Sequence, residues 1–384
     1  MKIQCLLLLL CGATACSEVF YRDRPCGTNM ETLWLDVVAV VDSSQGMTVA
    51  GLKNIAGTIG SIFAGSQIGA NPTNPRTTRV GLVTYDYEAR VIANLTKYRS
   101  IDDLMKGSDA DLTTISKNTT SLVALGLQAA QDLLFKESFD TERGHYKKVV
   151  IVFASAFKGD GKEKPEPVAN RLKTRGVKII TVAYDQGGEG NIVEELSKIA
   201  SEGFGFKNTP NPVDDVQGAL LKVNCFCPSN HRIQYRTSSL SYATCIQPVG
   251  MASVWHAAKI SCASRWNNTY LASEFNQEKH DFIFNTVKST NIISPPYKYH
   301  IGLNRESGLW QWKQPAGKSQ LMVRDFFKWG QGYPMENPKM SAGMNVENGQ
   351  GWAEWRNVGP MNSAASYVCE TEACDTENYC VNNQ

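Results

Sequence analysis

The first half of the chain alternates short, continuous apolar runs with longer stretches whose apolar residues recur at helical spacing. Continuous apolar runs predict buried β-strands, and apolar residues at every third and fourth position predict amphipathic helices. The expected strands are residues 34–41, 80–85, 87–93, 149–153 and 177–184, and the expected helices are residues 52–63, 122–134, 168–174, 192–200 and 214–223. This alternation predicts an α/β fold with a doubly wound, mostly parallel sheet covered on both faces.

The second half has a different pattern. It predicts two early helices, Ala252–Arg265 and Ala272–Val287, followed by short strands and long loops that contain most of the eight tryptophans. This pattern is typical of a separate α+β domain with loop-rich β-structure. Only Asn224–Pro228 joins the halves, without a Gly/Ser-rich or Pro-rich linker.

Composition and charge exclude several classes of function. The 39 Lys and Arg residues nearly balance the 37 Asp and Glu residues, and no Lys/Arg run is longer than two. This balance gives no reason to expect nucleic acid as a partner. The five histidines lack zinc-site spacing, and the chain has no Gly-x-Ser-x-Gly or phosphate-binding Gly-rich loop. We therefore expect that the protein is not an enzyme.

The first residues have the pattern of a secretory signal peptide. The basic start at Lys2 is followed by the run Leu6–Leu10 and by the small residues Ala13–Ala15. Neither this run nor any later segment reaches the ~20 apolar residues of a membrane-spanning helix. We therefore expect that residues 1–16 are removed, that the protein is secreted to the extracellular space, and that it has no transmembrane segment.

The cysteines and sequons agree with secretion. Cleavage after Cys16 would leave eight of the eleven cysteines, whereas cleavage after Ala15 would leave nine. An even number suits a secreted protein, in which thiols usually pair. The candidate N-glycosylation sites are Asn94, Asn118 and Asn267.

Oxygen-bearing residues follow two expected strands and precede one expected helix. The loops are Asp42–Gly46, Asn118–Ser121 and Ala154–Ala156. With the strand order, these loops make Cys26–Cys225 resemble the von Willebrand factor type A domain. The resemblance implies a divalent cation held by an Asp-x-Ser-x-Ser loop, a Thr and a further Asp.

Only part of that ligand set is present. Asp42, Ser44 and Thr119 match it, but Gly46 replaces a serine and Ser155 replaces the second aspartate. One interpretation is that Asp42, Ser44, Thr119 and Ser155 hold Mg²⁺ weakly through waters. The other is that Asp42 caps the following helix and the hydroxyls bond to loop backbone.

Residues 227–371 resemble the C-type lectin-like domain, and residues 372–384 form a short polar tail. The matching pieces are Cys227-Pro228, Cys245, Trp255, Ala258, Cys262, Leu271-Ala272-Ser273 at the start of the second helix, Ile301-Gly302-Leu303, Trp310, Trp312, Trp329, Gly332, Pro334 and Tyr367–Glu370. The resemblance implies the disulfides Cys227–Cys245 and Cys262–Cys369, and it leaves Cys26 for Cys225. Cys374 and Cys380 are near enough in sequence to pair locally.

The residues at the calcium loop of this family differ in this chain. Calcium-binding members use Glu-Pro-Asn in a long loop and Trp-Asn-Asp on the next strand, where this chain has Tyr333-Pro334-Met335 and Trp355-Arg356-Asn357. Tyrosine and methionine are poor Ca²⁺ ligands, and Arg356 would repel a cation. The neighbouring Glu336-Asn337 would restore some oxygens in a shifted alignment.

The long loop is nevertheless the candidate ligand-binding region. Its candidate residues are Trp329, Tyr333, Pro334, Glu336, Asn337, Trp355 and Asn357. The apolar residues there either face a ligand or pack on the domain's own core. We expect a structural role for Pro334, through a cis bond that shapes the loop.

The pair of domains resembles a class of secreted nematode proteins linked to recognition of microbial surfaces or matrix. The resemblance implies an innate-immune or extracellular-surface binding protein, with an extracellular protein or glycan as partner and no certain cofactor. The first alternative is a Ca²⁺-dependent carbohydrate-binding lectin. The second is a matrix or adhesion protein with a weak Mg²⁺ site in its first domain.

Overall fold

The computed structural model describes residues 23–136, 143–157, 164–184, 191–229 and 231–381. The expected signal peptide, residues 1–16, lies outside this range. The chain divides into two compact units. One comprises Gly27–Phe226 with Cys374–Gln384, and the other comprises Met1–Cys26 with Cys227–Ala373.

The first unit is built on a six-stranded sheet with the order β3-β2-β1-β4-β5-β6. Its strands are β1 (Leu35–Asp42), β2 (Arg79–Tyr85), β3 (Ala89–Ala93), β4 (Lys147–Ala154), β5 (Lys178–Ala183) and β6 (Gly205–Lys207), and its helices are α1 (Val49–Phe63), α2 (Ile101–Asp111), α3 (Val123–Lys136), α4 (Pro165–Thr174), α5 (Asn191–Ser197) and α6 (Pro212–Val223). Only the edge strand β3 runs antiparallel to its neighbour. The doubly wound, mostly parallel sheet expected from the sequence is therefore confirmed.

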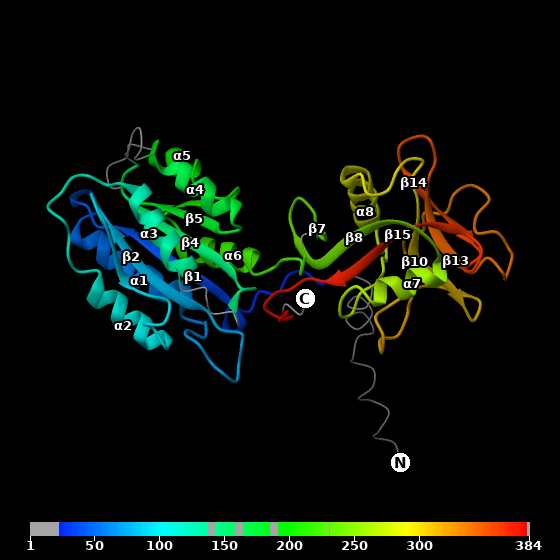
Figure 1. The fold of residues 1–384 in the computed structure, drawn as a ribbon, viewed down its shortest axis with the longest axis horizontal. Coiled ribbons are helices and arrows are strands. Elements are labelled where there is room, and N and C mark those ends of the chain that lie inside the picture. The colour runs from blue at the N-terminus through cyan, green and yellow to red at the C-terminus, as the bar shows by residue number, and fades with distance from the viewer. Residues whose placement is uncertain (1–22, 137–142, 158–163, 185–190, 230, 382–384) are drawn as a thin grey trace, which may run out of the picture. The chain divides into compact units, whose positions relative to one another are not determined.

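Helices cover both faces of this sheet, with α1 and α2 on one face and α3, α4 and α5 on the other (Figure 1). Successive β1 residues point to opposite faces, so Val37 and Val41 pack under α1 while Val38 and Val40 pack under α3. Every residue of β1 is buried, which explains its apolar run from Val37 to Val41, and the buried Asp36 before that run is paired with Arg79 and Arg143. The pattern did not reveal α2 or β6, because α2 is mostly polar and β6 has only three residues.

The second unit is built on a nine-stranded sheet that contains the path β12-β11-β10-β15-β8-β7. Its strands are β7 (Ile233–Arg236), β8 (Ser241–Val254), β9 (Tyr270–Leu271), β10 (Lys298–Glu306), β11 (Leu309–Trp312), β12 (Leu321–Met322), β13 (Ala342–Glu347), β14 (Ala353–Val358) and β15 (Ala364–Glu372), and its helices are α7 (Trp255–Ala263) and α8 (Gln277–Thr290). Residues 313–341, between β11 and β13, form the long loop and contain only the short strand β12. This is the expected α+β domain.

Both helices of this unit begin later than the sequence predicted. Residues 252–254 extend β8, which pairs with β15 as far as Val254. Residues 272–276 are not helical, because Ala272 donates its N–H to Val368 and Asn276 is the N-cap of α8. The Leu271-Ala272-Ser273 segment therefore precedes α8 by several residues and does not open it.

The disulfides and the tail complete the two units. The structure contains the bridges Cys227–Cys245, Cys262–Cys369 and Cys374–Cys380, and Cys26 and Cys225 are also disulfide-bonded. The final segment is not a separate tail. The ring of Tyr379 lies 4.9 Å from that of Trp34, so this segment is part of the core of the first unit. Within the described ranges, no helix has the length and apolar character required to cross a bilayer.

Candidate functional site

Asp42, the one carboxylate of the expected cation loop, is fully buried at the end of β1. Its Oδ1 accepts a hydrogen bond from the backbone N–H of Ser44 at 2.9 Å. Its Oδ2 accepts from the hydroxyls of Ser121 at 3.0 Å and Ser155 at 2.7 Å, and from the Ser155 N–H at 3.2 Å. The carboxylate thus ties three loops together and has four donors from the protein itself.

The structure brings Asp42, Ser44 and Ser155, three of the residues expected at this cation site, together through hydrogen bonds to the Asp42 carboxylate. Ser155 lies where the second aspartate was expected and bonds directly to Asp42, and Thr119 is exposed. Asp42 does not cap the following helix, because Thr48 is the N-cap of α1 and accepts from the Gly51 N–H. The described residues contain no group of three or more His, Cys, Asp or Glu side chains able to hold a metal ion.

Asn357 is the last residue of the expected calcium triplet Trp355-Arg356-Asn357 in the second unit. The long loop bonds to its whole side-chain amide. Its Oδ1 accepts from the Met335 N–H at 2.8 Å, and its Nδ2 donates to the carbonyls of Met335 at 2.9 Å and Met340 at 3.0 Å. The Tyr333–Pro334 peptide bond is cis, as expected for Pro334. Asn357 is fully buried, and these three bonds to loop backbone show that it shapes the loop.

The neighbouring side chains do not assemble an alternative set of oxygen ligands. The Arg356 guanidinium lies 5.5 Å from the centre of the Tyr333 ring, so a positive charge lies beside a residue of the expected calcium loop. Glu336 is exposed and its carboxylate lies 3.9 Å from Arg305, while the Asn337 Oδ1 accepts from the Lys339 N–H. The predicted long-loop residues thus lie in one region. There Arg356 contacts the Tyr333 ring, and the side chains of Asn337 and Asn357 form hydrogen bonds with loop backbone.

Trp355 is the centre of an aromatic cluster beneath the long loop. Its ring lies 5.3–5.7 Å from those of Trp312, Phe326 and Trp329. It is fully buried, so its role is to support the loop rather than to touch a ligand. Trp329 is half-buried on the same cluster.

Glu274 anchors this cluster and is not among the residues predicted from the sequence. This buried carboxylate accepts from Trp355 Nε1 at 2.6 Å and Asn345 Nδ2 at 2.7 Å, and it bonds His280 Nδ1 at 2.7 Å. Burial alone would lower the pKa of His280, but the Glu274 carboxylate raises it above the ordinary value. The only sequence signal is a charged residue directly after an apolar segment.

Exposed apolar side chains lie on the long loop and on the turn between β13 and β14. Phe327 is 60% exposed, Met335 43% and Trp352 43%. The loop and turn are neighbours, because the Trp355 N–H donates to the Lys328 carbonyl. This region therefore presents apolar side chains to solvent.

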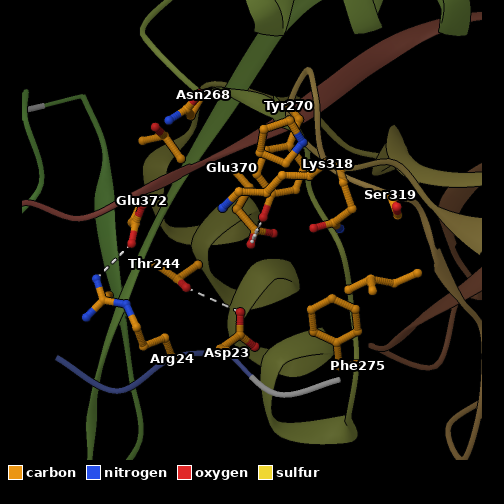
Figure 2. Close-up of a pocket in the computed structure, with 15 residues that line it drawn as sticks. Asp23, Arg24, Thr244, Asn268, Tyr270, Phe275, Lys318, Ser319, Glu370 and Glu372 are labelled. Atoms are coloured by element: carbon orange, nitrogen blue, oxygen red, sulfur yellow. Dashed lines mark hydrogen bonds and ion pairs between the residues drawn. The ribbon is translucent and has the colours of Figure 1, made fainter. Parts of the chain in front are cut away.

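A second region that the sequence did not reveal is a pocket of about 450 Å³ in the lectin unit (Figure 2). Beneath it, the fully buried Lys279 ammonium is paired with the carboxylates of Asp23 and Glu370. Glu370 also accepts from the Tyr270 hydroxyl at 2.8 Å and the Ser273 N–H at 2.9 Å. Burial, reinforced by the Glu370 charge, raises the pKa of Asp23 despite the opposing effect of Lys279.

The expected glycosylation sites lie at the surface to different extents. Asn94 and Asn267 are exposed, whereas Asn118 is half-buried. The Asn118 carbonyl accepts from the Gln45 N–H, so this sequon lies in the loop region around Asp42. Its glycosylation stays a prediction.

The two units correspond to known families. Residues 36–216 match the von Willebrand factor type A domain, and residues 252–381 match the lectin C-type domain. The chain is thus a protein with a von Willebrand factor type A domain followed by a C-type lectin domain. This pair of domains supports an extracellular recognition or binding role.

Among curated proteins, the chain is similar to C-type lectin domain-containing protein 160 of Caenorhabditis elegans, with 24% identity over 374 residues. The match covers 94% of this chain, which spans only 56% of that relative's length. Among solved structures, proximal thread matrix protein 1 from the mussel byssus is 22% identical with a TM-score of 0.40, covering 49% of this chain and 45% of its own. The C-type lectin CEL-I from Cucumaria echinata is 19% identical with a TM-score of 0.30, covering 37% and 95%.

Proposed function

We propose that this chain is a secreted, non-enzymatic recognition protein whose lectin domain binds an extracellular protein or glycan without calcium. The observation that carries the proposal is the Asn357 amide, whose oxygen and nitrogen are both bonded to long-loop backbone. Asn357 is fully buried, so a calcium ion could reach its Oδ1 only if the long loop moved, and the Arg356 charge nearby would oppose the ion. Hydrogen bonds within the protein therefore hold the long loop in shape, the role that a calcium ion would have in a calcium-dependent lectin.

The ligand surface in this proposal is apolar. Phe327, Met335 and Trp352 are large exposed side chains on the loop and the adjoining turn. Aromatic and methionine side chains are enriched in the centres of protein interfaces and also stack on sugar rings. Microbial or matrix surfaces are the candidate targets that the domain pair suggests.

The test is binding of the purified chain to arrays of glycans and extracellular proteins, with and without EDTA. We expect ligands whose binding EDTA does not change and which the double variant Phe327→Ala/Met335→Ala no longer binds. Met251→Ala, which alters an equally exposed apolar residue on β8, is the matched control. EDTA-sensitive binding would contradict the proposal and favour a Ca²⁺-dependent lectin.

Calorimetric titration with each cation separates the remaining alternatives. We expect no heat of specific binding with either Ca²⁺ or Mg²⁺. Heat with Mg²⁺ that disappears in Asp42→Ala would instead support adhesion through the first domain. Heat with Ca²⁺ that disappears in Asn357→Ala would support the calcium-dependent lectin.

A further inference from the structure

Three lysines surround a pocket of about 380 Å³ between α7 and the first part of the long loop. Lys259 lies on α7, while Lys313 and Lys318 lie on the loop after β11. No acidic residue is among the described residues that line this pocket. The pocket shares the wall formed by Tyr270 and Lys318 with the larger pocket of Figure 2.

The positive charge of this pocket is not neutralised by the protein. Within the described ranges, no carboxylate forms an ion pair with Lys259, Lys313 or Lys318. The acids that line the adjoining pocket already have cationic partners, because Asp23 and Glu370 pair with Lys279 and Glu372 pairs with Arg24. Three uncompensated cations around one concavity focus a positive potential into it.

The pocket also contains a polar group that lacks a partner. Thr269 is only 4% exposed, and within the described structure its hydroxyl forms no hydrogen bond. A buried hydroxyl without a partner is unfavourable, so a ligand oxygen there would satisfy it. Ile260 and Ala263 supply apolar lining on the same side as α7.

We propose that this pocket binds the acidic residue of a glycan, one that carries a sulfate or a carboxylate group. The lysines would hold the oxyanion, the Thr269 hydroxyl would bond to a ligand oxygen, and the aliphatic side chains would contact the ring. A small acidic sugar is favoured over a long polyanion because the three lysines line one pocket and the whole chain carries a net charge of only +2.

This inference does not depend on the proposed function. Phe327, Met335 and Trp352, which form the ligand surface of the proposed function, do not line the pocket, and no metal takes part. The loop variant Phe327→Ala/Met335→Ala should therefore leave acidic-glycan binding unchanged. If acidic glycans do not bind but the Phe327/Met335 surface still binds its ligand, this inference fails and the proposed function stands. The opposite result contradicts the proposed function and leaves this inference standing.

The test is calorimetry of the full chain at low ionic strength with a heparin-derived hexasaccharide, an oligogalacturonate, a desulfated neutral hexasaccharide and inorganic sulfate. We expect one of the two acidic oligosaccharides to bind, and its affinity to fall with added salt. Lys259→Gln/Lys313→Gln/Lys318→Gln should lose about tenfold or more in affinity, because three charge-assisted contacts are removed. Thr269→Val also removes the Asn267 sequon, so it is compared with Asn267→Gln, which lacks the same sequon but keeps the hydroxyl. Thr269→Val should bind a few fold more weakly than Asn267→Gln while the domain stays folded by near-ultraviolet circular dichroism.

The matched control is Lys288→Gln/Lys298→Gln/Lys339→Gln, which removes the same charge from exposed lysines elsewhere in the domain. Equal losses in the two triple variants would overturn the inference, because the effect would then come from net charge. Inorganic sulfate that binds as tightly as the oligosaccharides would overturn the glycan assignment. Failure of both acidic oligosaccharides to bind the folded chain would overturn it as well.

Discussion

The sharpest test of the lectin domain's energetics is the substitution Lys279→Met, which keeps the apolar stem and removes the charge. Lys279 is fully buried in α8, and its ammonium is paired with Asp23 and with Glu370. After the substitution, Glu370 keeps the bonds from Tyr270 and Ser273. Asp23 keeps only a bond from Thr244 at 3.2 Å. Two buried carboxylates therefore remain without a cation.

The expected cost is large because the remaining charges are both buried. Removing one partner of a buried ion pair costs about 3–5 kcal/mol, since the other partner is left uncompensated. Burial and the charge of Glu370 already raise the pKa of Asp23 while Lys279 opposes them, so loss of Lys279 raises that pKa further. A carboxyl group whose pKa is raised in the folded state binds a proton before the unfolded chain does. Acidification below the raised pKa should therefore recover part of the lost stability.

The assay is urea unfolding of the oxidised chain at neutral and mildly acidic pH, followed by tryptophan fluorescence. Lys288→Met, an exposed change on the same helix, is the control and should cost less than about 0.5 kcal/mol. A neutral-pH loss below about 1 kcal/mol would refute the reasoning about burial. A loss that grows on acidification would refute the reasoning about Asp23.

Three further predictions concern the buried hydrogen bonds of Asp42, Asn357 and His280. Asp42→Ala should destabilise the first domain by at least about 2 kcal/mol in urea unfolding, because the hydroxyls of Ser121 and Ser155 lose their acceptor. Stability equal to wild type would contradict this role. Asn357→Ala should cost about 1–3 kcal/mol and speed proteolytic cleavage of the long loop, and an unchanged cleavage rate would mean that other contacts shape the loop. The raised pKa of His280 contributes stability that is complete below the ordinary value of 6.5 and is lost as pH rises through the folded value. His280→Gln should therefore weaken the lectin domain most at acidic pH, and equal losses at acidic and alkaline pH would contradict that assignment.

The architecture of the first domain and the loss of metal ligands can be read from the sequence. A strand buried on both faces, such as β1, is mostly apolar, so its position is visible in the sequence although it contains Asp36, whose charge is paired with Arg79 and Arg143. A missing carboxylate, such as the aspartate replaced by Ser155, is equally visible. The sequence left open what Asp42 does without a cation, because its partners Ser121 and Ser155 lie 79 and 113 residues away.

Tertiary structure alone decided where the remaining charges lie. Nothing local brings Asp23 to Lys279, 256 residues later, or joins Glu274 to Trp355. The start of α8 was also misplaced, because an N-cap at Asn276 and strand contacts at Ala272 override apolar periodicity. Periodicity reports which face of an element is buried, whereas pairing of buried polar groups depends on contacts between distant segments that local sequence does not encode.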